Sequence, residues 1–143
     1  MSATSGPFAH TIRVRFAECD PQGVVFNAHY LAYVDIAITE LWRAAFGSYQ
    51  AMLERGFDVV VAEANLRFRA PARFDDELRL EVDVTHLGTT SIITRHRICR
   101  EQQALVEVEI RHVMVDRDSL AKAPIPDWVR AGLSRWTLVK SSD

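Results

Sequence analysis

A long apolar stretch that follows a turn constrains the fold of this chain more than any other feature. Apolar side chains recur at helical spacing over residues 27–46, which predicts a helix of about 30 Å at ~1.5 Å per residue. Asn27 is a favourable N-cap residue for this helix. Few polar side chains interrupt the pattern, and they are Asp35, Thr39, Glu40 and Arg43. Other parts of the chain must therefore cover most of the helix surface.

The turn before this helix brings a carboxylate close to the helix N-terminus. Asp20-Pro21-Gln22-Gly23 is a turn sequence, because Pro presets its φ angle and Gly accepts a positive φ. The first N–H groups of a helix lack partners within the helix, and the helix dipole is positive at that end. We therefore expect Asp20 to lie where a carbonyl group can be both polarised and attacked.

The rest of the chain has a period of two, which indicates strands. Residues 60–69 form one strand, in which Val60, Ala62, Ala64, Leu66 and Phe68 share a face. The other expected strands cover residues 11–16, 78–85, 91–100 and 104–116, and short helices are expected at 49–55 and after Pro124. The element order is therefore β-α-β-β-β-β, with most strands joined as consecutive hairpins.

This order predicts an α+β fold in which one long helix covers a single face of an antiparallel sheet of about five strands. Residues 1–9 are expected to be a disordered tail, and residues 10–143 a single domain. The opposite face of the sheet carries apolar side chains among its charges, at Val59, Val61, Ile93, Leu105, Val113 and Val115. A homo-oligomer is the natural way to cover such a face.

Composition argues against several classes of function. A net charge of −2 gives no global attraction to nucleic acid or to anionic membranes. No signal peptide and no membrane-length apolar run is visible, so a cytoplasmic protein is expected. Cys19 and Cys99 have neither metal-site nor disulfide-framework spacing, and no histidine pair has metal-site spacing. We expect no metal and no cofactor.

The sequence resembles the hotdog-fold acyl-CoA thioesterases, in particular the 4-hydroxybenzoyl-CoA thioesterase branch. The matching pieces are Arg15-Phe-Ala-Glu-Cys-Asp20, Gly23-Val-Val-Phe26 and Tyr30 with the helix after it. A second piece, Arg69-Ala-Pro-Ala-Arg-Phe-Asp-Asp76, resembles the segment that enters the third strand of the family. The resemblance covers about residues 10–120.

The resemblance implies a helix wrapped by a curved sheet that pairs with a second copy into a double sheet. A homodimer or homotetramer is expected, with active sites at the dimer interface. The family's catalytic carboxylate falls on Asp20, and its carbonyl-polarising backbone N–H falls on Asn27. One sub-branch, which acts on short aliphatic acyl-CoAs, often has His at the Asn27 position. The Asn found here argues against a His-assisted mechanism, and we do not assign that role to the nearby His29. The acyl approach is expected to be shaped by Gly23, Val24, Val25, Phe26 and Tyr30.

Thioester hydrolysis needs an oxygen nucleophile and a group that holds the developing oxyanion. Asp20 can attack the carbonyl to give a mixed anhydride, or it can act as general base on water. The helix N-terminus supplies the donors for the oxyanion. The alternative is that Asp20 is only a turn or capping residue. Coenzyme A (CoA) enters as part of the substrate, and its phosphates are expected to meet Arg67, Arg69 and Arg73, which otherwise belong to a solvated strand face.

The sequence therefore predicts an acyl-CoA thioesterase, with three alternatives. A thioesterase acting on acyl-carrier-protein substrates has the same chemistry with a different carrier surface. A dehydratase of this fold is disfavoured, because no His is visible with a carboxylate at the site. A non-catalytic binding module is disfavoured by the presence of Asp20 and Gly23. His96 and His112 are expected to be core or pocket-lining side chains.

Overall fold

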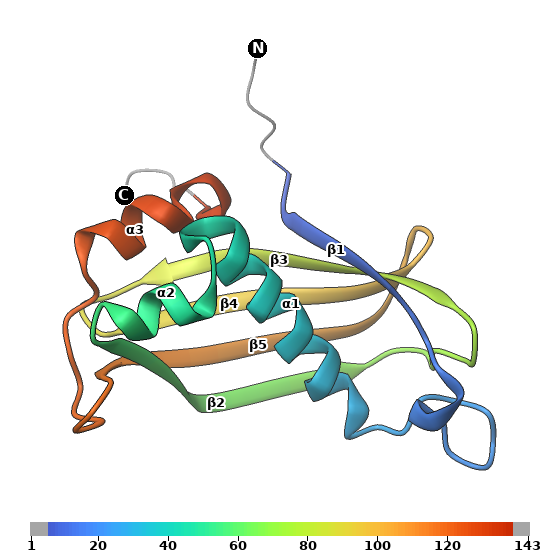
Figure 1. Cartoon of the computed structure of the whole chain (residues 1–143). Coiled ribbons are helices and arrows are strands. Elements are labelled where there is room, and N and C mark those ends of the chain that lie inside the picture. The colour runs from blue at the N-terminus through green and yellow to red at the C-terminus, as the bar shows by residue number, and fades with distance from the viewer. Residues whose placement is uncertain (1–5, 139–143) are drawn as a thin grey trace.

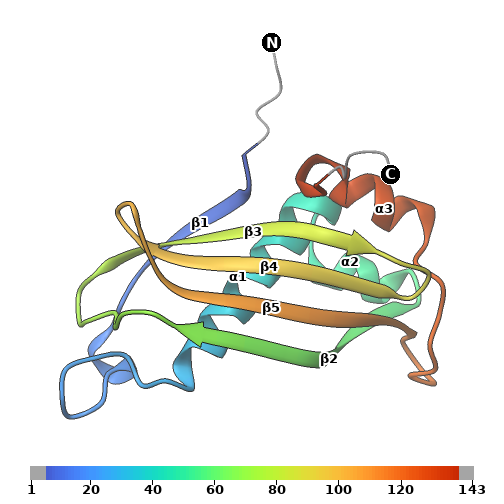
Figure 2. The same ribbon diagram turned by 180° about the vertical axis from the view of Figure 1, so that it is seen from behind.

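A computed structural model describes residues 6–138 and shows a curved antiparallel sheet around one long helix (Figure 1). The sheet has the strand order β1-β3-β4-β5-β2, so β1 and β2 are its two edges (Figure 2). The strands are β1 (Phe8–Arg13), β2 (Phe57–Phe68), β3 (Glu77–Leu87), β4 (Ser91–Arg100) and β5 (Gln103–Asp116). The predicted α+β class, element order and sheet size are confirmed.

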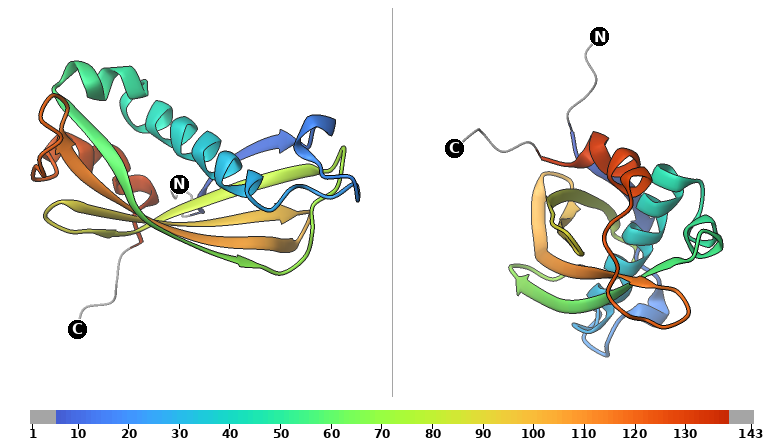
Figure 3. Two further views of the ribbon diagram at one scale, coloured as in Figure 1. Left: turned by 90° about the horizontal axis from the view of Figure 1, so that it is seen from below. Right: turned by 90° about the vertical axis from the view of Figure 1, so that its left-hand side faces the viewer.

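Helix α1 (His29–Phe46) lies along the concave face of the sheet (Figure 3). It ends at Gly47, whose φ of 93° suits a glycine and whose N–H donates to the Arg43 carbonyl. The shorter helical segments are η1 (Phe16–Glu18), α2 (Tyr49–Glu54), α3 (Asp127–Leu133) and η2 (Ser134–Trp136). Both predicted short helices, α2 and α3, are present.

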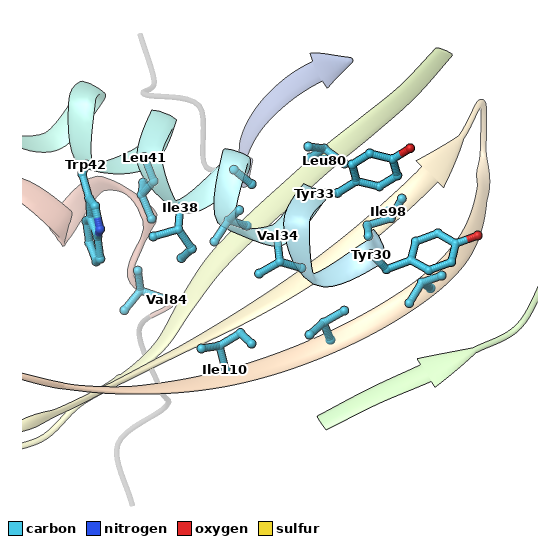
Figure 4. Close-up of a cluster of buried hydrophobic side chains, with 14 of the residues drawn as sticks. Tyr30, Tyr33, Val34, Ile38, Leu41, Trp42, Leu80, Val84, Ile98 and Ile110 are labelled. Carbon is cyan, nitrogen blue, oxygen red and sulfur yellow. The ribbon is translucent and has the colours of Figure 1, made fainter. Parts of the chain in front are cut away.

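The hydrophobic core lies between α1 and the sheet. The helix contributes Tyr30, Tyr33, Val34, Ala37, Ile38, Leu41 and Trp42, all buried. Facing them, alternating side chains of β3, β4 and β5 are buried, among them Leu80, Val84, Ile98 and Ile110 (Figure 4). The period of two in β3 and β5 therefore identifies the core face correctly.

The first strand begins earlier than the sequence pattern predicts. It spans Phe8–Arg13 and pairs with β3, so Phe8 and Ala9 belong to the sheet and not to a disordered tail. Residues 1–5 of that predicted tail lie outside the described residues. The strand stops before Phe16 because the Glu18 carboxylate accepts a hydrogen bond from the Arg15 backbone N–H, which draws the chain into η1.

A β-bulge in β2 changes which side chains share a face. Val61 pairs with His112 and the next pair is Glu63 with Arg111, so Ala62 is an extra residue. The predicted common face of 60, 62, 64, 66 and 68 is therefore wrong before the bulge. Val59 and Val61 pair with the inward-facing Met114 and His112, and so join the concave face.

The predicted apolar outer face is also partly wrong. Leu105, Val113 and Val115 are buried within the single chain. The segment after β5 folds back, with the Ala123 N–H donating to the Met114 carbonyl, and residues 69–70 hydrogen bond to Leu105. Exposed apolar side chains instead gather on edge strand β2, where Val60, Val61 and Phe68 are 39%, 62% and 56% exposed. The incompletely covered apolar surface therefore includes an edge of the sheet, and further exposed apolar side chains lie elsewhere, at Phe16, Phe26 and Phe74 among others.

Candidate active site

The Asp20 turn is a tight hairpin at the N-terminal end of α1. The Asp20 N–H donates to the Val24 carbonyl at 2.8 Å, and the Gly23 N–H donates to the Asp20 carbonyl at 2.9 Å. Gly23 has a φ of 82°, which explains a glycine at this position. One Asp20 carboxylate oxygen, Oδ1, accepts from the Gln22 N–H at 2.8 Å. The predicted turn is confirmed, and half of the carboxylate takes part in it.

A buried carboxylate, Glu18, fixes this hairpin to α1. It accepts hydrogen bonds at 2.8 Å from the Arg15 N–H, 2.9 Å from Arg15 Nε and 2.8 Å from the Tyr33 hydroxyl. Burial by itself raises the pKa of Glu18, but the bonds from Arg15 and Tyr33 outweigh it and hold the pKa below its usual value. Glu18 is therefore an ionised anchor for the loop, while its backbone carbonyl accepts from the Phe26 N–H at 3.0 Å.

The structure brings a histidine to this anchor, which the sequence-based reasoning missed. His29 Nε2 lies 3.8 Å from Glu18 Oε2, and the His29 ring packs edge-on against Tyr33. The argument against a dehydratase, that no His stands with a carboxylate here, is therefore wrong on this point. The pair forms only because the hairpin folds back on the first turn of α1, and no residue spacing in the sequence signals that contact.

The first turn of α1 differs from the expected capping pattern. Ala28 occupies the N-cap position, and no side chain caps the helix, so the prediction of Asn27 as N-cap is wrong. The chain enters through two tight turns, in which the His29 N–H donates to the Phe26 carbonyl and the Tyr30 N–H to the Asn27 carbonyl. Among residues 6–138, no hydrogen-bond acceptor is recorded for the Asn27 N–H. The backbone donor predicted at Asn27 is thus free for a ligand.

An apolar cleft of about 430 Å³ opens beside this donor. Its walls are Val25, Asn27, Tyr30, Phe68, Arg69, Ala70 and Pro71. Tyr30 contributes its ring to the cleft and accepts a hydrogen bond from the Ala72 N–H at 3.0 Å, which holds the connection between β2 and β3. Burial raises the pKa of Tyr30, so this side chain is a neutral phenol. Tyr30 and Tyr33 lie at the same end of α1 (Figure 4).

The sequence-predicted site residues divide into three places. Val25, Asn27, Tyr30 and Arg69 line the cleft. The adjoining hairpin contains Asp20, Gly23, Val24 and Phe26, which do not line the cleft of the single chain. Arg73 contacts that hairpin through a β-bridge to Val24. Arg67 lies in a separate pocket with Arg95, Glu107 and Glu109, away from the cleft.

The remaining reactive groups near the hairpin do not point to thiol or metal chemistry. Burial, together with the carboxylates of Glu18 and Asp20, raises the pKa of Cys19, so its thiol stays protonated. Within residues 6–138, no group of three or more His, Cys, Asp and Glu side chains is placed to hold a metal ion. No helix in the described part of the chain has the length and apolarity needed to cross a bilayer.

Comparison with known proteins places this geometry in a family. The thioesterase-like superfamily matches residues 14–133. The acyl-CoA thioester hydrolase YbgC of Escherichia coli is 32% identical over 120 residues, which cover 83% of this chain and 90% of YbgC. The 1,4-dihydroxy-2-naphthoyl-CoA hydrolase of Thermosynechococcus vestitus is 28% identical over 122 residues, 84% of each chain. The crystal structure of a hypothetical protein from Thermus thermophilus superposes with a TM-score of 0.82 at 32% identity, covering 90% of this chain and 98% of that one. The chain therefore belongs to the hotdog-fold thioesterase-like superfamily.

Proposed function

We propose that this protein hydrolyses acyl-CoA thioesters to a free acid and CoA. The observation that carries the proposal is the apolar cleft at the N-terminal end of α1, where the Asn27 N–H is free and the Asp20 hairpin adjoins. The similarity to YbgC of Escherichia coli, an acyl-CoA thioester hydrolase, supports the same substrate class. The direct test is a panel of acyl-CoAs with aromatic, short and long acyl groups, scored by the thiol released.

The proposed chemistry divides between the hairpin and the helix. The Asn27 N–H and the positive end of α1 hold the thioester carbonyl oxygen as negative charge develops on it. Asp20 provides or activates the oxygen nucleophile, either by attacking the carbonyl carbon itself or by taking a proton from the attacking water. The C–S bond then breaks, and the CoA thiolate leaves and takes up a proton.

A second copy of the chain would complete the wall of the site beside the Asp20 hairpin and the cleft. The edge strand β2, next to the cleft, has exposed apolar side chains, and no strand of residues 6–138 pairs with its outer side. We propose that two β2 edges pair antiparallel about a two-fold axis near the middle of the strand. This gives a double sheet with two equivalent sites.

The Ala62→Asp variant tests this pairing. Ala62 is the exposed bulge residue near the centre of β2, so in the dimer two new carboxylates would lie close together across the axis. Light scattering at micromolar concentration is expected to give a dimer or tetramer mass for wild type and a smaller mass for Ala62→Asp. The control is Thr11→Asp, which places the same charge on the other edge strand, β1. A stable and active wild-type monomer would contradict the proposed interface.

The arginines predicted to bind CoA phosphates now separate into two groups. Arg73 is exposed beside the hairpin, and no ion pair of its guanidinium is recorded within residues 6–138. Arg69 lines the cleft but pairs with Glu107 at 3.0 Å. Replacing Arg73 or Arg69 by Gln is expected to raise KM for acyl-CoA with little change in kcat, since phosphate contacts act equally on the ground and transition states.

Arg67→Gln is the matched control, because Arg67 lies away from the cleft. A short acyl thioester that lacks the nucleotide should be hydrolysed equally by wild type and by all three variants. If none of the variants changes KM for acyl-CoA, the phosphate contacts lie elsewhere. If wild type hydrolyses the truncated thioester as efficiently as acyl-CoA, the substrate is instead carried by an acyl-carrier protein.

A further inference from the structure

We infer that a second cleft, beside the C-terminal half of α1, recognises a neutral hydroxyl group at the far end of the acyl chain. This inference rests on the proposed thioesterase function and adds a substrate class to it. The cleft has a volume of about 250 Å³ and lies between α1, the start of α2, β2 and β5. Its lining includes Asp35, Thr39, Trp42, Tyr49, Val61 and His112.

His112 is the side chain that we propose to bind the hydroxyl group. It lines the cleft but is only 5% exposed, and its Nδ1 has no hydrogen-bond partner within residues 6–138. Its Nε2 also has no hydrogen-bond partner in that part of the chain, but Nε2 is not fully buried, so it is the ring nitrogen that a molecule in the cleft can reach. In a neutral imidazole this nitrogen is either an N–H donor or an acceptor, depending on the tautomer. A hydroxyl group, which both donates and accepts, matches Nε2 in either tautomer.

A comparison with His96 shows that burial alone does not explain His112. His96 lies on the same face of the sheet and is equally buried, and its Nδ1 also lacks a partner in the described residues. However, His96 Nε2 lies 2.9 Å from the Thr94 hydroxyl, and His96 does not line the cleft. His112 instead faces the opening, with the Trp42 ring edge-on at 6.0 Å.

The charges around the cleft select a neutral group. The Asp35 carboxylate lines the cleft, and Asp58 accepts a hydrogen bond from the Tyr49 hydroxyl at 2.5 Å. Burial and the Asp58 carboxylate raise the pKa of Tyr49 to about 12, so Tyr49 remains an uncharged phenol. Burial lowers the pKa of His112, so its neutral imidazole adds no positive charge to the cleft. A carboxylate or phosphate terminus would thus be repelled, whereas a hydroxyl would be accepted.

Both clefts are lined by α1 and by β2, and we infer that one extended acyl chain reaches from the first to the second along these two elements. Tyr30 lines the first cleft and Ile38 the second, two helical turns away and about 12 Å along the axis at ~1.5 Å per residue. Strand β2 follows the same path, with Phe68 at the first cleft and Val61 at the second. Val61 reaches this face only because of the bulge at Ala62. A medium-length acyl chain with its thioester at Asn27 would place its terminus near His112.

The experiment compares a medium-chain ω-hydroxyacyl-CoA with the unsubstituted acyl-CoA of equal length. Wild type is expected to prefer the hydroxylated substrate by at least ~10-fold in kcat/KM, because a site that bonds a hydroxyl discriminates against the analogue without it. His112→Leu should bring this ratio close to one while the unsubstituted substrate reacts within a few-fold of wild type. His96→Leu, the matched control, should keep the wild-type ratio. An unchanged ratio in His112→Leu overturns the inference.

A binding measurement on the wild-type protein covers the case in which His112→Leu does not fold. Adding the free ω-hydroxy acid is expected to shift the imidazole nitrogen-15 NMR signals of His112 and leave those of His96 in place. The unsubstituted acid should move neither. If the hydroxy acid fails to shift His112, or shifts both histidines alike, the cleft is not a hydroxyl site. A protein that hydrolyses no acyl-CoA would contradict the proposed function, and the NMR result would still decide the cleft by itself.

Discussion

Replacing Asp20 by asparagine is expected to lower kcat at least ~10²-fold, the low end for a positioned general base. The loss should be in turnover and not in folding, because the asparagine side-chain oxygen can still accept the hydrogen bond that Asp20 Oδ1 takes from the Gln22 N–H. What disappears is the negative charge that attacks the thioester or takes a proton from water. Steady-state kinetics on the best acyl-CoA, together with a thermal unfolding curve, measure both properties.

The matched control for this variant is Asp75→Asn. Asp75 lies in the neighbouring loop with a φ of 71°, a conformation that asparagine tolerates well, and its carboxylate lies 3.7 Å from Arg13. It should keep kcat within a few-fold of wild type. If Asp20→Asn does the same, Asp20 is a turn residue without a catalytic role.

A single turnover in oxygen-18 water separates the two proposed roles of Asp20. A general base delivers the solvent oxygen directly to the product acid, which is then labelled. If Asp20 attacks first and water then cleaves the anhydride at the Asp20 carboxyl carbon, the product carries an unlabelled oxygen and the label remains on Asp20. Unlabelled product with labelled Asp20 therefore identifies nucleophilic attack.

Acidification from pH 7 to pH 5 is expected to remove about 4 kcal/mol of the free energy of unfolding. Burial lowers the pKa of His96 to about 3, with a further contribution from His112, and lowers the pKa of His112 to about 4. In the unfolded chain both return to about 6.5. Between these values the unfolded state binds more protons than the folded state, so stability is complete above about pH 6.5 and falls as the pH drops.

Urea unfolding at pH 7, 6 and 5 measures this dependence. The depressed pKa of Glu18 has its effect near and below the usual glutamate pKa, so the window above pH 5 excludes the effect of Glu18. His96→Leu and His112→Leu should each reduce the slope of stability against pH by about one proton. Equal stability at pH 7 and pH 5, or variants with the slope of wild type, would show that these imidazoles become protonated without unfolding.

The fold was predictable wherever a local pattern carries the information. The apolar period of 3.6 residues placed α1, and the alternation around Leu80, Val84 and Ile110 identified the core face. The pattern failed at Ala62, because a bulge adds a residue without changing composition. It failed again at Leu105, Val113 and Val115, since their burial depends on segments that fold back from elsewhere in the chain.

The candidate site was predictable to a similar degree. The turn at Asp20 and its place before α1 followed from Pro21, Gly23 and the helical period. The anchoring of that turn by Glu18 did not, because its partners Tyr33 and His29 come together only in three dimensions. The separation of Arg67 from Arg69 also depends on the end of β2, which alternation alone does not locate.

The strand order has a consequence for how the chain is made. The two strands nearest the N-terminus, β1 and β2, are the two edges of the finished sheet, and they pair with β3 and β5. During synthesis the first half of the chain, α1 included, thus emerges from the ribosome before any strand with which β1 and β2 pair. The hairpins β3-β4 and β4-β5 are local in sequence and can form first, whereas both edges must wait for contacts between distant segments. The apolar side of α1 stays partly uncovered until the later strands and α3 are released, so protection of this nascent helix from aggregation falls to chaperones or to the speed of the last steps.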